Sequence, residues 1–178
     1  MEPGPAARAS GCCCSSAWGG VGADVRAGLL LAALTLGACG DAAPPARDLE
    51  VGTGEAAFEA VVDGQEVPLI FGPQGGHHVW VSFRGADAPA GDALLDLDVV
   101  PLGEVDPPPR SAPVRVRPSP AATGWEYIGW PAILPDASCF VGVPLSIEAT
   151  LTFADGSVGS DTMVVVPAEG APGLGPCP

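Results

Sequence analysis

The sequence predicts an all-β protein: a single immunoglobulin-like antiparallel β-sandwich of about seven or eight strands that follows a signal peptide. Three observations support this prediction. Short runs rich in Val, Leu, Ile and Phe recur at regular spacing, and several of them alternate apolar with polar residues. The stretches between them hold many of the 25 Gly and 21 Pro residues. No segment after Arg47 has helical periodicity.

The N-terminal region has the pattern of a bacterial lipoprotein signal. An uncharged, mostly apolar run follows Arg26 and ends in Leu-Gly-Ala-Cys at residues 36–39. The run is too short to span a bilayer as a mature helix. Its last four residues resemble the lipobox, in which small residues precede the Cys that accepts a diacylglyceryl group. We therefore predict a signal peptide over 25–38 and acylation of Cys39, for instance with palmitate, as the anchor to the membrane.

The predicted anchor divides the chain into four parts. Residues 1–24 are expected to be an extension outside the mature protein, and we hypothesise that translation starts at Val25. The segment 39–55 is predicted to be the lipidated Cys and a flexible tether, and 56–178 the sandwich. Gly40 follows the lipidated Cys where lipoproteins retained in the inner membrane tend to carry Asp. The predicted location is therefore the cell envelope, in the outer membrane rather than the inner.

The first strands are expected to form a hairpin. Residues 57–62 and 65–70 flank Asp63-Gly64, a dipeptide typical of type I′ turns. Pro68 cannot donate to a ladder, so the second strand is expected at an edge or a bulge.

Alternation is clearest over 77–84. It predicts a strand with Val79, Val81 and Phe83 on one face and His78 and Trp80 on the other. The remaining expected strands are 92–100, 114–117, one or two within 125–134, and a hairpin of 144–153 with 158–166 around Asp155-Gly156.

Two cysteines remain in the exported part besides Cys39. An oxidising compartment and an even number favour a disulfide between Cys139 and Cys177.

The net charge of −14 excludes nucleic acid as a partner, because phosphate contacts need clustered Arg or Lys. Only Arg110, Arg115 and Arg117 come close together in sequence, among prolines. We interpret them as part of a solvated strand and its approach.

Chemistry-bearing residues are few. The chain has two His and no Gly-x-Ser-x-Gly segment, and alternation places Asp96 and Asp98 on a solvated face. His77 and His78 point to opposite faces of a strand, so one metal site could use only one of them. No catalytic, metal-binding or cofactor-binding residue is predicted, and the protein is expected not to be an enzyme.

The aromatic residues supply a candidate binding surface. It consists of His78, Trp80, Trp125, Tyr127 and Trp130. Packing in the core and at its rim is the alternative role for these rings. A platform for a glycan or a protein would need two of the rings to be coplanar and to face solvent.

One segment, Gly72–Trp80, has the pattern Gly-Pro-Gln-Gly-Gly-x-His-x-Trp, with His78 at its His position. It resembles a stretch shared by uncharacterised lipoproteins of GC-rich Gram-negative bacteria that carry an immunoglobulin-like sandwich. The resemblance implies the fold and the anchoring but no activity. We hypothesise that the segment is structural, with Gly75 and Gly76 at positive φ and His78 covered by Trp80 and hydrogen-bonded to the preceding loop.

These observations favour a non-catalytic binding or interaction module, anchored in the envelope, with an envelope protein or a glycan as its partner. The alternative is a secreted binder of a small solute or a metal, and the third class is a hydrolase.

Overall fold

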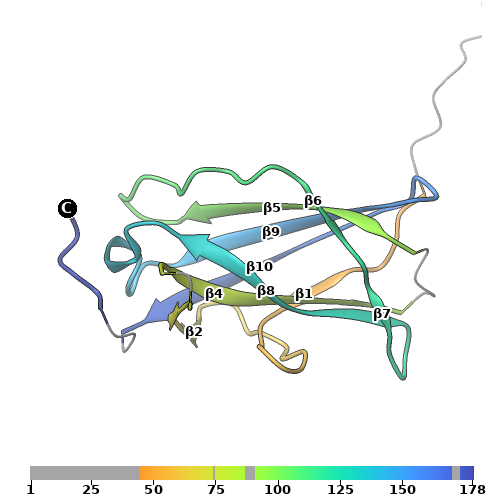
Figure 1. The fold of residues 1–178 in the computed structure, drawn as a ribbon, viewed down its shortest axis with the longest axis horizontal. Helices are drawn as coiled ribbons and strands as arrows, with labels where there is room; N and C mark the ends of the chain where they lie inside the picture. Colours follow the sequence, from red (N-terminus) through yellow and green to blue (C-terminus); the bar gives the residue numbers. More distant parts are fainter. Residues whose placement is uncertain (1–44, 74, 87–90, 170–172) are drawn as a thin grey trace, which may run out of the picture. The chain divides into compact units, whose positions relative to one another are not determined.

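The computed structural model describes residues 45–73, 75–86, 91–169 and 173–178. The predictions for the signal peptide, for Cys39 and for the start of the tether lie outside these residues. The described chain forms two five-stranded sheets packed face to face (Figure 1). The predicted all-β sandwich is confirmed.

The first sheet has the order β1-β4-β8-β7, and β3 pairs with β4 beside β1. Its strands are β1 (Glu50–Gly52), β3 (Ile70–Phe71), β4 (His77–Gly85), β7 (Ser119–Pro120) and β8 (Trp125–Leu134). The pairing of β4 with β8 is antiparallel, with a bulge where Ser82 is skipped in the register.

The second sheet has the order β2-β10-β9-β5-β6. Its strands are β2 (Gln65–Pro68), β5 (Ala93–Pro101), β6 (Val114–Val116), β9 (Leu145–Phe153) and β10 (Val158–Ala168). Seven of these strands correspond to those of an immunoglobulin-like sandwich: β1, β4, β5, β7, β8, β9 and β10. The first, second, fifth and fourth of the seven form the first sheet, as in that fold. A 3-10 turn, Ala137–Cys139, connects the sheets after β8.

The core lies between the sheets and follows the strand alternation. Val79, Val81 and Phe83 of β4 are fully buried, as predicted. Alternate residues of β9, from Leu145 to Phe153, are buried in the same way. Each large apolar side chain that leaves water in this manner contributes roughly 1.5–3 kcal/mol.

The predicted first hairpin is wrong. Asp63-Gly64 does make a turn, but β2 pairs in parallel with β10 at the sheet edge, and residues 57–62 form no strand with it. This pairing also departs from an all-antiparallel sandwich. The edge position predicted from Pro68 is correct.

The segment before that turn packs elsewhere, which explains the error. The Thr53 hydroxyl donates to the Trp80 carbonyl at 2.8 Å, and the Ser82 hydroxyl donates to the Gly54 carbonyl at 2.9 Å. These bonds hold residues 53–54 on the outer face of the first sheet. These tertiary contacts with β4 therefore outweigh the local preference of Asp63-Gly64 for a hairpin.

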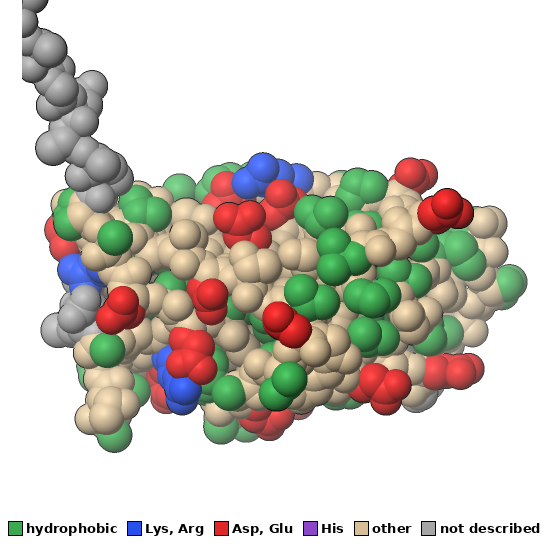
Figure 2. All heavy atoms as spheres, turned by 180° about the vertical axis from the view of Figure 1, so that it is seen from behind, with side chains coloured by type: hydrophobic (Ala, Val, Ile, Leu, Met, Phe, Trp, Pro, Cys, Tyr) green, Lys and Arg blue, Asp and Glu red, His purple; other side chains and the backbone are tan. Residues whose placement is uncertain are grey.

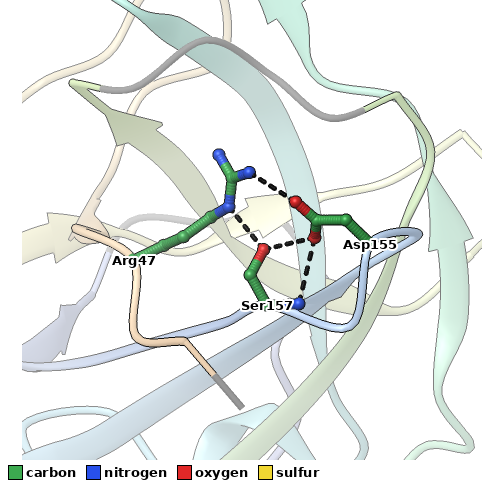
Figure 3. Close-up of polar contacts among 3 residues, drawn as sticks. All are labelled: Arg47, Asp155 and Ser157. Carbon is green, nitrogen blue, oxygen red and sulfur yellow. Dashed lines mark hydrogen bonds and ion pairs between the residues drawn. The ribbon is translucent and has the colours of Figure 1, made fainter. Parts of the chain in front are cut away.

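The fold also begins before residue 56, so the predicted tether is too long. Val51 of β1 is 5% exposed, and the Ala46 backbone pairs with Val158 of β10. A cluster of polar side chains fastens this start (Figure 3). Arg47 contacts both the Asp155 carboxylate, at 2.8 Å, and the Ser157 hydroxyl. The first described residues are thus tied to the β9–β10 hairpin.

Candidate functional site

The candidate site lies at the start of β4, on the outer face of the first sheet. Val79 and Val81 point into the core. Strand alternation therefore turns their neighbours His78 and Trp80 to the outer face. His78 is paired across the sheet with Ile70 on one side and Ile133 on the other, and Trp80 with Pro131.

A tight turn covers His78. The Gly72 amide donates to the Gly76 carbonyl at 2.9 Å, and the Gly75 amide donates to the Gly72 carbonyl at 3.1 Å. Gly75 and Gly76 have φ values of 81° and 92°, which confirms that this segment uses backbone angles that a Cβ disfavours. Gly72 is buried against the imidazole, and a Cβ there would lie 3.4 Å from His78 Cε1.

The rings of His78 and Trp80 meet edge to face, with centroids 4.3 Å apart and planes at 73°. His78 is 6% exposed. Burial lowers the pKa of its imidazole below the usual 6.5; the nearby carboxylate of Glu55 partly offsets the effect, and His77 adds to it. The ring is therefore held in its neutral form at neutral pH.

Two ring nitrogens in this pair lack partners. Among the described residues, neither His78 Nε2 nor Trp80 Nε1 makes a hydrogen bond, and both atoms are buried. The expected cover by Trp80 is correct, but His78 Nε2 makes no hydrogen bond to the described residues of the preceding loop. A buried polar group without a partner costs about 1–3 kcal/mol. Asp96 Oδ1 and Trp125 Nε1, the latter in the core, also lack partners among the described residues.

These residues line a hollow of about 220 Å³. Its other walls are the turn residues Gly72, Pro73, Gly75 and Gly76, with His77, Pro131 and Ile133. Ile133 is 67% exposed and offers an apolar wall to solvent. Among the described lining residues, only the imidazoles of His77 and His78 can carry a charge.

The other three aromatic candidates lie apart from this hollow. Trp125 is fully buried and packs edge to face on Phe153 in the core, so its assignment to a binding surface is wrong. Tyr127 and Trp130 are half-buried against the core, with ring planes at 51° to each other. No coplanar platform forms among the described rings: His78 pairs with Trp80, and Tyr127 pairs with Trp130 at a centroid distance of 6.3 Å.

The charged residues form ion pairs on the surface. Arg117 and Arg115 contact Asp92, at 2.7 and 3.7 Å, and Arg110 contacts Asp96 at 3.0 Å. All three arginine side chains are more than half exposed, which agrees with a solvated strand and its approach. Figure 2 shows acidic side chains spread over one face, with the basic groups beside acidic ones and hydrophobic side chains gathered in one half.

Ser157 is the described serine whose surroundings most resemble a catalytic cluster. Its hydroxyl donates to Asp155 and accepts from Arg47 (Figure 3). Hydrogen bonds from Ser157 and then Arg47 lower the pKa of the Asp155 carboxyl to about 2. Such a carboxylate is a poor base, and a guanidinium cannot accept a proton, so this cluster fastens the chain and does not activate a nucleophile. Sequence reasoning missed it, although Asp155 two residues before a Ser is a signal for an Asx turn.

The predicted disulfide is present between Cys139 and Cys177, with Cα atoms 4.8 Å apart. It borders a second hollow, of about 440 Å³, together with Phe140 and a run of prolines at 107–109. The disulfide removes both thiols from nucleophilic chemistry.

In the part of the chain that the structure describes, no group of three His, Cys, Asp or Glu side chains could hold a metal ion. The same residues include no helix of the length and apolarity that a membrane span needs.

No protein-family model matches the chain, and comparison with curated proteins and with solved structures finds no match.

Proposed function

We propose that this protein is a lipid-anchored, non-catalytic binding module of the bacterial cell envelope. Cys39 carries the lipid, and the sandwich engages another envelope component through the hollow at the start of β4. The observation that supports the binding role is the hollow itself, which is lined by the rings of His78 and Trp80 and by the exposed side chain of Ile133.

The anchoring half of the proposal comes from residues 36–39, whose Leu-Gly-Ala-Cys pattern follows an apolar run of signal-peptide length. More than one acyl chain on Cys39 gives a stable anchor, since each buried methylene contributes about 0.8 kcal/mol. Gly40 after the Cys favours the outer membrane.

The non-catalytic half comes from the described side chains. The hydroxyl of Ser157 is held between a carboxylate with a pKa of about 2 and a guanidinium, and neither can take its proton. His78 stands next to Trp80 and the glycine turn, with no described nucleophile hydrogen-bonded to it.

Anchoring is tested in the bacterium by labelling with palmitate. The Cys39→Ala variant is expected to take up no label and to remain unprocessed by the lipoprotein peptidase. Equal acylation and membrane retention in that variant would contradict the anchoring.

Binding is tested by incubating the full-length, acylated protein in detergent with isolated cell-wall sacculi. The wild type is expected to sediment with the sacculi, and the His78→Ala and Trp80→Phe variants to sediment less. Tyr127→Phe, which changes an aromatic residue outside the hollow, is the matched control and is expected to behave as wild type. Sedimentation that both hollow variants leave unchanged would overturn this role of the hollow.

A further inference from the structure

We infer that the edge of β8, over residues 130–133, binds an extended peptide segment with a basic residue at one end, as an added strand of the first sheet. The inference goes beyond the function proposed above, because it concerns a different hollow of about 210 Å³, here called the edge hollow. The two hollows have only Pro131 and Ile133 in common.

The edge hollow lies along the backbone of β8. Four consecutive residues, 130–133, line it. Successive side chains of a strand point to opposite faces, so a hollow that touches all four lies against the strand edge. The wall across from them is formed by Leu97 and Val99, which share one face of β5. β7 pairs only with the first two residues of β8 (Figure 1), so the rest of β8 has no strand partner other than β4 among the described residues.

Backbone groups of Pro131 and Ile133 point to this free edge. Pro131 is opposite Trp80 in the register, and a proline has no N–H to give to a ladder. The Trp80 carbonyl accepts from the Thr53 hydroxyl, which lies on the β1 side of β4, so this carbonyl is turned away from β8. The pair therefore exchanges no hydrogen bonds, and by alternation neither does the pair of Ile133 with His78. The Pro131 carbonyl and the N–H and carbonyl of Ile133 face away from β4.

These edge groups can take a new partner. No backbone hydrogen bond of the described residues joins 130–133 to the segment 102–113, part of which also lines the hollow. The Ile133 side chain is 67% exposed, so the edge is reached from solvent. An unpaired edge is a template for another chain, and an extended peptide supplies N–H and C=O groups at the matching spacing. Its alternate side chains would meet Leu97 and Val99, which favours small apolar residues at every second position.

Charge beyond the end of β8 selects the end of the peptide. The edge hollow shares Pro108 and Pro109 with the hollow at the disulfide, whose described lining has no basic residue. That lining includes three exposed acids, Glu104, Asp106 and Asp136. Each described arginine forms an ion pair with an acid elsewhere.

The ligand that suits these three acids is a side-chain cation. No group of three acids, His or Cys among the described residues could hold a metal ion. A Lys or Arg side chain at the end of the peptide complements their charge. A second copy of this chain, with a net charge of −14, is repelled. The occupant is therefore a basic segment of a different protein.

The test titrates fluorescein-labelled pentapeptides with the full-length protein in detergent and follows their fluorescence anisotropy. The probes are Lys-Val-Thr-Val-Thr and the reverse order, Thr-Val-Thr-Val-Lys, so that both strand directions are covered. At least one is expected to bind saturably and to slow deuterium exchange of the backbone amides in 130–134. The same peptide with Glu in place of Lys is expected to bind about tenfold more weakly. Absence of saturable binding by both peptides overturns the inference.

Methylated peptides test the strand pairing on the unaltered protein. In an added strand, only alternate N–H groups face β8. Methylation of both valine nitrogens and methylation of both threonine nitrogens are therefore expected to differ, with one form losing about tenfold more affinity than the other. Equal effects of the two forms, or no effect of either, would assign the binding to an apolar groove and overturn the added strand.

A matched pair of variants tests the edge N–H. Ile133→Pro removes this donor, whereas Ile133→Ala removes only the side chain, and a proline fits here because Pro131 already occupies the same edge. Ile133→Pro is expected to bind the peptide about tenfold more weakly than Ile133→Ala. Val62→Ala, at an exposed apolar residue elsewhere, is the control and should match the wild type. Equal affinities of the two Ile133 variants would contradict the added strand; if Ile133→Pro does not fold, the methylated peptides decide.

The acidic end is tested separately. Asp136→Asn keeps a residue type that tolerates the φ of 51° at this position, so the fold is expected to be retained. The variant should bind the Lys peptide more weakly and leave the Glu peptide unaffected. Equal weakening of both peptides would overturn the charge selection. Self-association of the wild type that Ile133→Pro abolishes would assign the edge to a second copy and overturn the peptide as its occupant.

Discussion

The guanidinium of Arg47 lies 2.8 Å from the Asp155 carboxylate, across 108 positions of the chain. The same guanidinium stacks on the ring of Phe153, 4.9 Å from its centroid, so the contact joins the start of the sandwich to its last hairpin through both charge and packing.

This contact predicts a specific loss of stability in acid. The Asp155 carboxyl has a pKa of about 2 in the folded protein against 3.8 in the unfolded chain. Its contribution is therefore fully present above pH 3.8 and is lost as the pH falls toward 2. Thermal melts across this range should show a steeper decline for the wild type than for Asp155→Asn. Asp63→Asn, at an exposed turn, serves as the control, and a decline as steep in Asp155→Asn would refute the prediction.

The buried imidazole of His78 predicts a second effect, at higher pH. Its folded pKa is below 6.5, so the unfolded chain takes up a proton first as the pH falls. Stability is complete above pH 6.5 and decreases below it until the folded pKa is reached. Melting temperatures at pH 7.5 and 5.5 should differ more in the wild type than in His78→Gln. Equal differences in the two proteins would show that the ring titrates as it does in water.

The glycine turn over His78 predicts a backbone effect. Gly75→Ala and Gly76→Ala are each expected to destabilise the fold by about 1–3 kcal/mol, because both residues have positive φ although a Cβ would have room. Denaturant unfolding gives the value. Gly175→Ala, where a Cβ also meets nothing within 4 Å, is the control and should be neutral. Neutral variants at both Gly75 and Gly76 would mean that the turn adopts other angles.

The disulfide predicts a redox-dependent stability. Cys139 and Cys177 close a loop with a sequence separation of 38, and loop entropy assigns the bond about 4 kcal/mol at most. The double variant Cys139→Ser/Cys177→Ser should unfold at lower denaturant than the oxidised wild type and match the reduced wild type. A wild type whose unfolding midpoint does not respond to reductant would speak against the bond.

Strand alternation correctly predicted the core-facing residues of β4 and β9. Leu145 to Phe153 and Val79 to Phe83 point into the core where period-two patterning put them, because one face of each strand is buried. The hairpin around Asp63-Gly64 was mispredicted because a local turn preference says nothing about which sheet the chain joins next. The parallel pairing with β10 joins residues that are 100 positions apart in the chain, such as Gln65 and Val165.

The candidate site was predictable in part. Parity alone brings His78 beside Trp80, and the spacing of the glycines indicates the turn that covers them. Trp125 was placed on the surface wrongly, since a strand that alternates weakly, as β8 does, does not reveal which of its aromatic residues faces the core. The missing hydrogen-bond partners of His78 and Trp80 depend on three-dimensional packing, and no one-dimensional pattern carries that information.

The Arg47 contact also fixes the end of the sandwich at which the described chain begins. It ties the chain at the end of the sandwich where Gly85 of β4 lies against Asp48, and His78 stands seven residues away along the same strand, roughly 23 Å at the rise of an extended chain (Figure 1). The chain therefore enters the sandwich at one end of β4, and the hollow at His78 lies toward the other end, so a ligand held there stands away from the point where the described chain begins.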